Sequence, residues 1–246
     1  MMDIDHPFLV SADVVFQTDY KIFFIMEFVR GGELFTLLRN LRRIPENHAR
    51  SYAIQLAFGL GYLHSQKFIY RDLKPENILI DEHGFIKLTD FGLSKSVKDG
   101  RKRDSFCGTK EYMSPEVVNK EGHWYGIDWW ALGVVTYEMI VGFPPFKTNK
   151  EDWRTMILKQ QPFFPDPIKH KIPMSQHCKD FILGCLNKNP DERLGARDDL
   201  DEVLAHPWFA GVDIDKLYKK EITPDYVPEL SPDRFDVSNF DEEFTS

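Results

Sequence analysis

The sequence has few cysteines: its 246 residues include three, Cys107, Cys178 and Cys185. Their separations match no metal-ligand spacing, and three cysteines in so long a chain do not predict a disulfide framework. The first residues, MMDIDHPF, contain neither a cationic region nor an apolar signal segment. We therefore expect an intracellular, cytoplasmic protein.

Long apolar runs are also lacking. The longest, WWALGVVTYEMIVGF, contains Glu138 and is too short to span a bilayer, so it predicts a buried helix and no membrane span. Basic residues are outnumbered, and the net charge of −8 argues against a general binder of nucleic acid or anionic membranes. The basic run GRKRD at 100–104 is more typical of a solvated loop.

What is present is a pattern of short strands followed by helices. With 42% hydrophobic residues the chain can bury a substantial core. Turn-like residues separate the strand-like runs, and Ser175 stands where a helix would begin. The pattern predicts a hairpin of strands 8–16 and 21–29, strands around 78–80 and 85–88, helices over 46–66, 126–142, 150–160 and 175–186, and an extended, proline- and acid-rich tail over 211–246 wrapped on the domain.

The stretch YRDLKPENILID at 70–81 places many polar side chains between two aliphatic runs. A loop that crosses a cleft, anchored by apolar residues at each end, explains this pattern. DFG at 90–92 and SPE at 114–116 follow in order. Together the three motifs form the catalytic-half signature of protein kinases, whereas DFG alone would be a weak signal.

Phosphoryl transfer needs a positioned hydroxyl and neutralised negative charge, and these residue types supply both. Asp72 would accept or orient the proton of the substrate hydroxyl. Asn77 and Asp90 would offer the hard oxygen ligands that Mg²⁺ prefers. Lys74 would place positive charge on the transferred group. Each residue taken singly is better explained as a solvated loop residue, or for Asn77 as a turn-forming side chain, but the set together is not.

The chain resembles the AGC group of serine/threonine protein kinases almost from end to end. The stretches that carry the resemblance are HPFLV, FQTDYKIFFIMEFVRGGELF, YRDLKPEN, SFCGTKEYMSPE, GIDWWALGVVTYEMIVGFPPF, NPDERLG, HPWF and SPDRFDVSNFDEEFT. The resemblance implies an α+β, protein-kinase-like fold. Residues 1–29 would be a remnant of the small lobe, 30–210 the large lobe and 211–246 the group's C-terminal tail.

The resemblance also implies roles in binding ATP. Backbone groups of the hinge would bind adenine, with Met26 as gatekeeper. The residues expected to bind the nucleotide are Met26, Glu27, Phe28, Val29, Glu33, Leu79, Thr89 and Phe240. The implied cofactors are ATP and Mg²⁺.

Substrate residues follow from the same resemblance. Glu33, Glu76 and Glu138 resemble an acidic set that selects arginines, whose forked hydrogen bonds suit carboxylates, and Thr109 is assigned to the same surface. Protein substrates are therefore the expected partners of what we expect to be a monomer.

Regulatory and structural positions are implied as well. Ser105 occupies the activation-loop phosphorylation position, where an upstream kinase would act and where Arg71 and Lys95 would pair with the phosphate. A plain loop serine is the competing interpretation. Glu116 and Arg193 match a buried ion pair, and Asp128 matches the carboxylate that braces the catalytic loop.

Three family features are not found in the sequence: the Gly-rich phosphate loop, the lysine of the third strand and its glutamate partner. Lys21, at the expected hairpin turn, and Gly59 and Gly61, inside an expected helix, are poor substitutes. We therefore expect weak ATP binding and little or no transfer from this chain alone. A kinase-derived docking module is the alternative to an active kinase, and an unrelated hydrolase with paired carboxylates has no further support.

Overall fold

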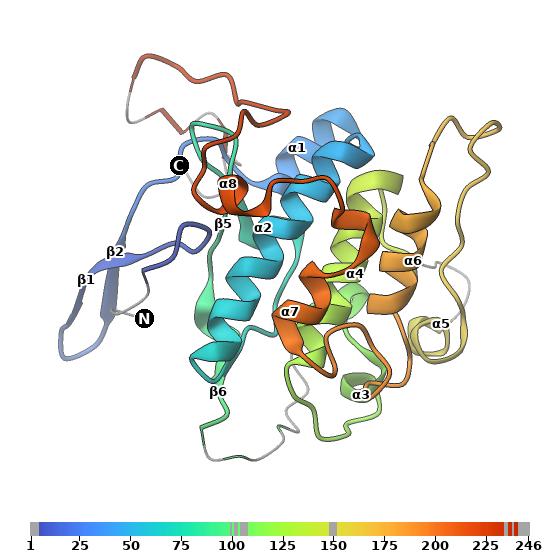
Figure 1. The fold of residues 1–246 in the computed structure, drawn as a ribbon. Helices are drawn as coiled ribbons and strands as arrows, with labels where there is room; N and C mark the ends of the chain where they lie inside the picture. Colours follow the sequence, from blue (N-terminus) through green and yellow to red (C-terminus); the bar gives the residue numbers. More distant parts are fainter. Residues whose placement is uncertain are drawn as a thin grey trace.

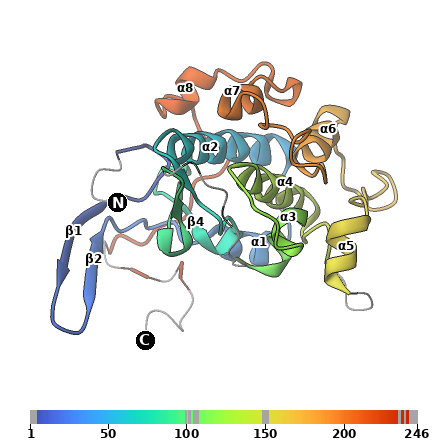
Figure 2. The same ribbon diagram turned by 90° about the horizontal axis from the view of Figure 1, so that it is seen from below.

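The computed structural model describes residues 5–98, 100, 103, 108–147, 152–233, 236–237 and 239–240. A body of helices carries small two-stranded sheets, and a β-hairpin projects from one side of that body (Figures 1 and 2). The predicted α+β fold is confirmed. The helices are α1 (Leu34–Leu41), α2 (Glu46–Ser65), α3 (Pro115–Val118), α4 (Gly126–Val141), α5 (Trp153–Lys159), α6 (Gln176–Cys185), α7 (Asp199–Leu204) and α8 (Ile214–Tyr218), and the strands are β1 (Ala12–Gln17), β2 (Ile22–Met26), β3 (Phe68–Ile69), β4 (Ile78–Ile80), β5 (Ile86–Leu88) and β6 (Lys95–Ser96).

Helices α2 and α4 form the centre of the core, because both are apolar around most of their circumference. Trp129 and Trp130 of α4 are fully buried. The Ser175 side chain caps α6 by accepting a hydrogen bond of 3.1 Å from the amide of Cys178. The three long predicted helices are thus confirmed to within one residue at each end. Within the described residues, no helix combines the length and apolar character needed to cross a membrane.

The hairpin forms, but its first strand is shorter than predicted. Strand β1 begins at Ala12, and Phe8, Leu9 and Val10 lie buried in the helical body. The amide of Val10 donates to the carbonyl of Leu88 at 2.8 Å, and the amide of Leu88 donates to the carbonyl of Phe8 at 2.9 Å. These residues leave the hairpin because burial against the body removes their apolar surface from water, whereas β1 and β2 remain largely exposed.

Strands β4 and β5 form the second predicted hairpin. Ile78 pairs with Leu88, and Ile80 pairs with Ile86, in an antiparallel ladder. Gly84 turns the chain between them with a φ of 92°, a value that favours glycine. The two strands therefore end side by side, next to Asn77 on one strand and Thr89 on the other.

The prediction of an extended tail over 211–246 is wrong at its start. Residues Ile214–Tyr218 form helix α8, whose Leu217 is fully buried and whose Tyr218 ring lies edge-on to Phe58 of α2, with 4.8 Å between ring centroids. The apolar residues of IDKLY are spaced so that one face of a helix can pack on the body. The prolines on either side of this stretch had favoured an extended chain in the prediction. Beyond α8 the described residues run along the body without a helix or strand. Helix α5 falls within the predicted 150–160, of which 150 and 151 lie outside the described residues.

Candidate active site

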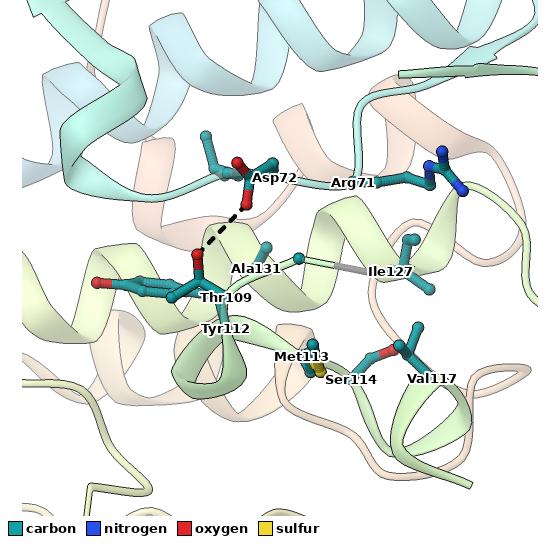
Figure 3. A pocket seen from close by; sticks show the side chains of 11 residues that line it. Arg71, Asp72, Thr109, Tyr112, Met113, Ser114, Val117, Ile127 and Ala131 are labelled. Atoms are coloured by element: carbon teal, nitrogen blue, oxygen red, sulfur yellow. Dashed lines mark hydrogen bonds between the residues drawn. The ribbon is translucent and has the colours of Figure 1, made fainter. Parts of the chain in front are cut away.

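The loop between β3 and β4 holds Asp72 in a network of polar contacts. The Asp72 carboxylate is nearly buried and accepts hydrogen bonds from Lys74 Nζ at 2.9 Å and Asn77 Nδ2 at 3.0 Å, both to Oδ2. Its other oxygen lies 3.4 Å from Thr109 Oγ1, a contact drawn in Figure 3. Lys74 Nζ also lies 3.4 Å from Thr109 Oγ1. The structure thus brings together three of the predicted catalytic or metal residues and Thr109.

Local sequence explains how this loop is shaped. Pro75 begins a single 3₁₀ turn, Pro75–Asn77, because its fixed φ suits the first helical position. The Asn77 side chain also donates to the Asp72 carbonyl at 2.9 Å, which closes the loop on itself. Next to this loop lies a cavity of about 20 Å³, partly lined by Leu73 and Ile127 (Figure 3). That volume is enough for about one water molecule.

Asp128 supports the same loop from below. This fully buried carboxylate on α4 accepts hydrogen bonds from the amides of Tyr70 and Arg71, both at 2.8 Å. Arg71 has a φ of 73°, in the left-handed region that costs a residue with a side chain about 1 kcal/mol or more. Two charge-assisted hydrogen bonds therefore hold the strained backbone directly before Asp72.

Asp90 lies at the end of β5, beside the loop that ends in Asn77. Its backbone has a φ of 53°, and its side chain accepts a hydrogen bond of 3.0 Å from the amide of Gly92. Asp90 is exposed, while Asn77 uses its amide nitrogen for the contacts to Asp72, which leaves the amide oxygen as a hard ligand. No group of three or more His, Cys, Asp or Glu side chains in the described part of the chain could hold a metal. Asn77 and Asp90 thus offer two oxygen donors. Mg²⁺ is usually bound by few protein oxygens together with phosphate oxygens, so this pair is compatible with that ion.

A second acidic group lies near Asp72. Glu138 of α4 accepts a hydrogen bond of 2.6 Å from Tyr112 Oη. The pKa of Glu138 is raised to about 7: burial raises it most, the Tyr112 hydrogen bond and Lys147 lower it, and the Glu76 carboxylate raises it. Glu76 Oε2 is buried without a hydrogen-bond partner in the structure. Two neighbouring, half-buried carboxylates, one with a buried oxygen that lacks a hydrogen-bond partner, form a surface that favours a cation.

Sequence reasoning missed Tyr112, which is the hydrogen-bond donor to Glu138. Its position within KEYMSPE offered no signal for the contact. Glu33, the third member of the predicted acidic set, pairs in the backbone with Leu79 just before α1.

Glu116 and Arg193 form a buried, two-pronged ion pair. Arg193 Nη1 and Nη2 donate to the two Glu116 oxygens at 2.6 and 2.9 Å, and Nη1 also donates to the Gly126 carbonyl at 2.9 Å. Burial alone would raise the pKa of Glu116, but the Arg193 guanidinium lowers it below its ordinary value. The pair joins the segment after α6 to α3, the short helix that follows Tyr112.

Comparison with known proteins decides the family. Residues 1–209 match the family model described as protein kinase domain. The chain belongs to this family. It is 44% identical to "Ribosomal protein S6 kinase 2 alpha" of Gallus gallus, over 100% of this chain and 32% of that protein. It is 42% identical to "Serine/threonine-protein kinase sgk-1" of Caenorhabditis elegans, over 97% of this chain and 50% of that protein.

A third relative is "Atypical protein kinase C" of Drosophila melanogaster, 40% identical over 98% of this chain and 41% of that protein. These relatives confirm the resemblance to AGC-group serine/threonine kinases. The kinase chain spans about a third to a half of the length of the relatives described here.

The hinge expected of a kinase lies between β2 and α1. Glu27 is anchored there by its side chain: its two carboxylate oxygens accept hydrogen bonds from Lys87 Nζ at 2.7 and 2.6 Å, and one accepts from the amide of Ser11 at 3.1 Å. Met26 is 47% exposed and Val29 is buried. The Glu27 side chain therefore fixes the hinge and is not a free group for a ligand.

Residues expected around adenine approach the hinge from two directions. The Phe240 ring of the tail stacks on Phe28, with 5.7 Å between centroids. Leu79 lies on β4 beside Lys87, and the Thr89 carbonyl accepts a hydrogen bond from Tyr70 Oη. Tail, hinge and the β4–β5 hairpin thus meet on one side of the molecule.

The expected activation segment is described only in part, and Ser105 lies outside the described residues. Arg71 Nε donates to the Leu93 carbonyl at 2.6 Å, and Lys95 pairs with Ile69 in the β3–β6 ladder. The Arg103 guanidinium donates to the Ser96 carbonyl, a contact that sequence reasoning missed. The two cations expected to bind the Ser105 phosphate therefore sit on neighbouring backbone segments.

Proposed function

We propose that this chain carries the phosphotransfer centre of a serine/threonine protein kinase that uses Mg²⁺ and ATP. The observation that supports it best is the Asp72 network, in which a nearly buried carboxylate is oriented by Lys74, Asn77 and Thr109. Asp72 would accept the proton of a serine or threonine hydroxyl as that oxygen bonds to the γ-phosphorus of ATP and the bond from this phosphorus to the ADP oxygen breaks.

Asn77 and Asp90 would hold the magnesium ion. The bound ion would neutralise charge on the phosphates during transfer. Lys74 adds positive charge beside Asp72, and the amides held by Asp128 keep the loop in place. Adenine would lie between the hinge backbone, Leu79 and Thr89, with Phe240 at its edge.

We infer that arginine-containing sites are preferred. Glu76 and Glu138 are half-buried carboxylates, and Glu76 Oε2 has no hydrogen-bond partner in the structure, so an arginine side chain would supply a donor and a charge there. Phosphorylation of Ser105 by an upstream kinase and binding of that phosphate by Arg71 and Lys95 belong to the same proposal, as does a cytoplasmic location.

Transfer by the 246-residue chain is expected to be slow. Its sequence contains no Gly-rich loop, and its one lysine before the hinge, Lys21, lies in the hairpin turn. Losing one preorganised charge-stabilising donor costs about 10²–10³ in rate. The alternative function is a docking module that binds basic segments through Glu76 and Glu138 without transfer, and the unpartnered Glu76 oxygen favours it equally.

The test is transfer of labelled phosphate from Mg²⁺-ATP to an arginine-containing serine peptide. We expect measurable but slow transfer that falls about 10²–10⁴-fold in Asp72→Asn, where the base is lost, and strongly in Asp90→Asn. Asp166→Asn, an exposed carboxylate remote from the loop, is the matched control. Transfer that persists in Asp72→Asn would contradict the proposed mechanism, whereas peptide binding with no transfer by the folded chain would favour the docking module.

A further inference from the structure

His64, at the end of α2, is buried between two carboxylates. One of them, Asp128, holds the loop between β3 and β4 that carries Asp72, called the catalytic loop below. Its Nε2 lies 2.9 Å from Asp128 Oδ2, and its Nδ1 lies 2.8 Å from Asp199 Oδ1. Because both ring nitrogens face carboxylate oxygens, both must carry a proton to satisfy the contacts. Burial alone would lower the pKa of His64, but the hydrogen bonds to Asp128 and Asp199 raise it to about 9.

Asp199 is built into this arrangement and is not a loose surface acid. It begins α7 with a φ of 48°, a strained value that its contacts must stabilise. Its Oδ1 also accepts a hydrogen bond of 2.8 Å from Trp129 Nε1 on α4. The Asp199 side chain is 36% exposed, whereas those of His64 and Asp128 are 0% and 1% exposed. Asp199 is therefore the outer member of a chain of contacts that ends on the catalytic loop.

We propose that Asp199 is a positioning residue for Asp72, acting through His64 and Asp128 on the backbone of Arg71. This proposal rests on the proposed function of Asp72. Asp128 shares its charge between the two loop amides and His64, so a cationic His64 stabilises a buried carboxylate that would otherwise be costly. Without the Asp199 charge, the proton of His64 is held less firmly, so the cation that balances Asp128 is lost at a lower pH. The hold of Asp128 on the strained backbone before Asp72 then weakens.

The groups that face His64 come from two helices besides its own. From α4 come the Asp128 carboxylate, the Tyr125 ring stacked at 4.5 Å and the Trp129 ring edge-on at 5.1 Å, and from α7 comes Asp199. The folded-state pKa of His64 lies above its ordinary value of 6.5. Its contribution to stability is thus complete below pH 6.5 and is lost as pH rises through about 9.

The experiment follows the ring protons of His64 and amide hydrogen exchange by NMR in the whole chain. The variant is Asp199→Asn, which keeps the shape and one acceptor but removes the charge, and the control is Asp201→Asn, an exposed acid on the same helix. We expect the titration midpoint of His64 to fall by about one unit, and exchange at Arg71 to accelerate about tenfold relative to exchange at Ile86. Ile86 is a suitable reference because its buried amide is held by Gln55, outside this network.

A second measurement needs no variant and remains decisive if Asp199→Asn does not fold. Raising the pH of the unaltered chain from 7 to 10 removes the proton of His64, and we expect the Arg71-to-Ile86 exchange ratio to rise over that range. A constant ratio would overturn the proposal, as would equal acceleration at both amides in the variant, since either marks a purely global effect.

Phosphate transfer provides the third measurement. We expect Asp199→Asn to lower kcat several-fold with little change in KM for ATP, and Asp199→Glu to restore part of the loss. If the unaltered chain transfers no phosphate, the proposed function fails, and the exchange ratio alone then decides whether Asp199 positions the loop.

Discussion

Glu138 and Glu76 differ from the neighbouring acid Asp72 in how their negative charge is balanced. Asp72 has Lys74 at 2.9 Å, so its charge is compensated within the loop. Glu138 has a neutral phenol as its donor, and burial moves its pKa to about 7. At the residue scale, the charge of Asp72 is therefore balanced within its own loop, whereas burial opposes the ionisation of Glu138.

The first prediction concerns binding of an arginine-containing peptide as a function of pH. Glu138 must lose its proton to pair with arginine, so affinity should rise about tenfold between pH 6 and pH 8, the range that brackets its pKa of about 7. In Glu138→Gln this rise should disappear, while Glu221→Gln, on exposed surface, should retain it. Fluorescence anisotropy with the labelled peptide measures both, and a pH-independent affinity in the unaltered chain would contradict the assignment.

The raised pKa of Glu138 also affects stability. A rise in pH, which should favour peptide binding, should lower the free energy of unfolding. Its ordinary value of 4.5 is raised in the folded state, so the native chain binds more protons than the unfolded chain between pH 4.5 and about 7. The free energy of unfolding therefore falls as pH rises through this window. Loss of the Glu138 proton thus destabilises the free protein at the pH at which the carboxylate is proposed to bind arginine.

At the scale of elements, close contact between α4 and α6 depends on Gly133. A Cβ at this position would lie 2.5 Å from Cys185 Cβ, a backbone-proximal atom that cannot rotate away. The added atom would therefore push α4 and α6 apart.

We predict that Gly133→Ala lowers the free energy of unfolding by about 1–2 kcal/mol, because the overpacking cost exceeds the gain in helix propensity. Gly184→Ala on α6 is the matched control: its Cβ would lie 3.4 Å from Leu194 Cβ, an ordinary contact, so stability should stay the same or rise slightly. Urea unfolding measures both. Stabilisation by Gly133→Ala would show that α4 and α6 can separate without cost.

At the scale of the whole molecule, the C-terminal segment returns across the body to the hinge. Lys220 pairs with Asp81 at 2.8 Å, and Asn47 Nδ2 donates to Asp225 at 2.9 Å. Gly84 leaves room for this path, since a Cβ there would overlap the Tyr226 carbonyl. Figure 1 shows the segment after α8 running back towards the hairpin side of the molecule.

Arg30, next to the hinge, holds the far end of this segment. Its Nη2 donates to the carbonyls of Ser231 and Asp233, both at 2.8 Å, and Asn239 Nδ2 donates to the Arg30 carbonyl at 3.2 Å. These contacts lie just before Phe240, the ring that stacks on Phe28. Arg30 is therefore placed to keep Phe240 at the expected adenine site.

We predict that Arg30→Ala weakens binding of a fluorescent ADP analogue about three- to tenfold, because two charged hydrogen bonds that order the tail are lost. Arg42→Ala, at the exposed end of α1, should leave the affinity unchanged. Titration of each variant with the analogue measures the effect. Equal affinities for Arg30→Ala and the unaltered chain would separate the tail from nucleotide binding.

The sequence by itself determined the family, the three long helices and the order of the motif residues. Asp72, Lys74 and Asn77 lie within one short loop, so their mutual contacts follow from spacing and turn chemistry alone. Asp90 could be placed beside them because β4 and β5 form a hairpin joined by a recognisable turn. Local patterns suffice wherever the partners are neighbours in the chain.

Only the tertiary structure decided which distant residues meet. Tyr112 with Glu138, Glu27 with Lys87, and His64 with Asp199 join elements whose relative placement no local pattern encodes. The burial of Phe8 in the body and of Leu217 in α8 likewise depends on surfaces supplied by α2. Long-range contacts form because packing of the helices brings these side chains together, and they set the charges and pKa values on which the proposed chemistry depends.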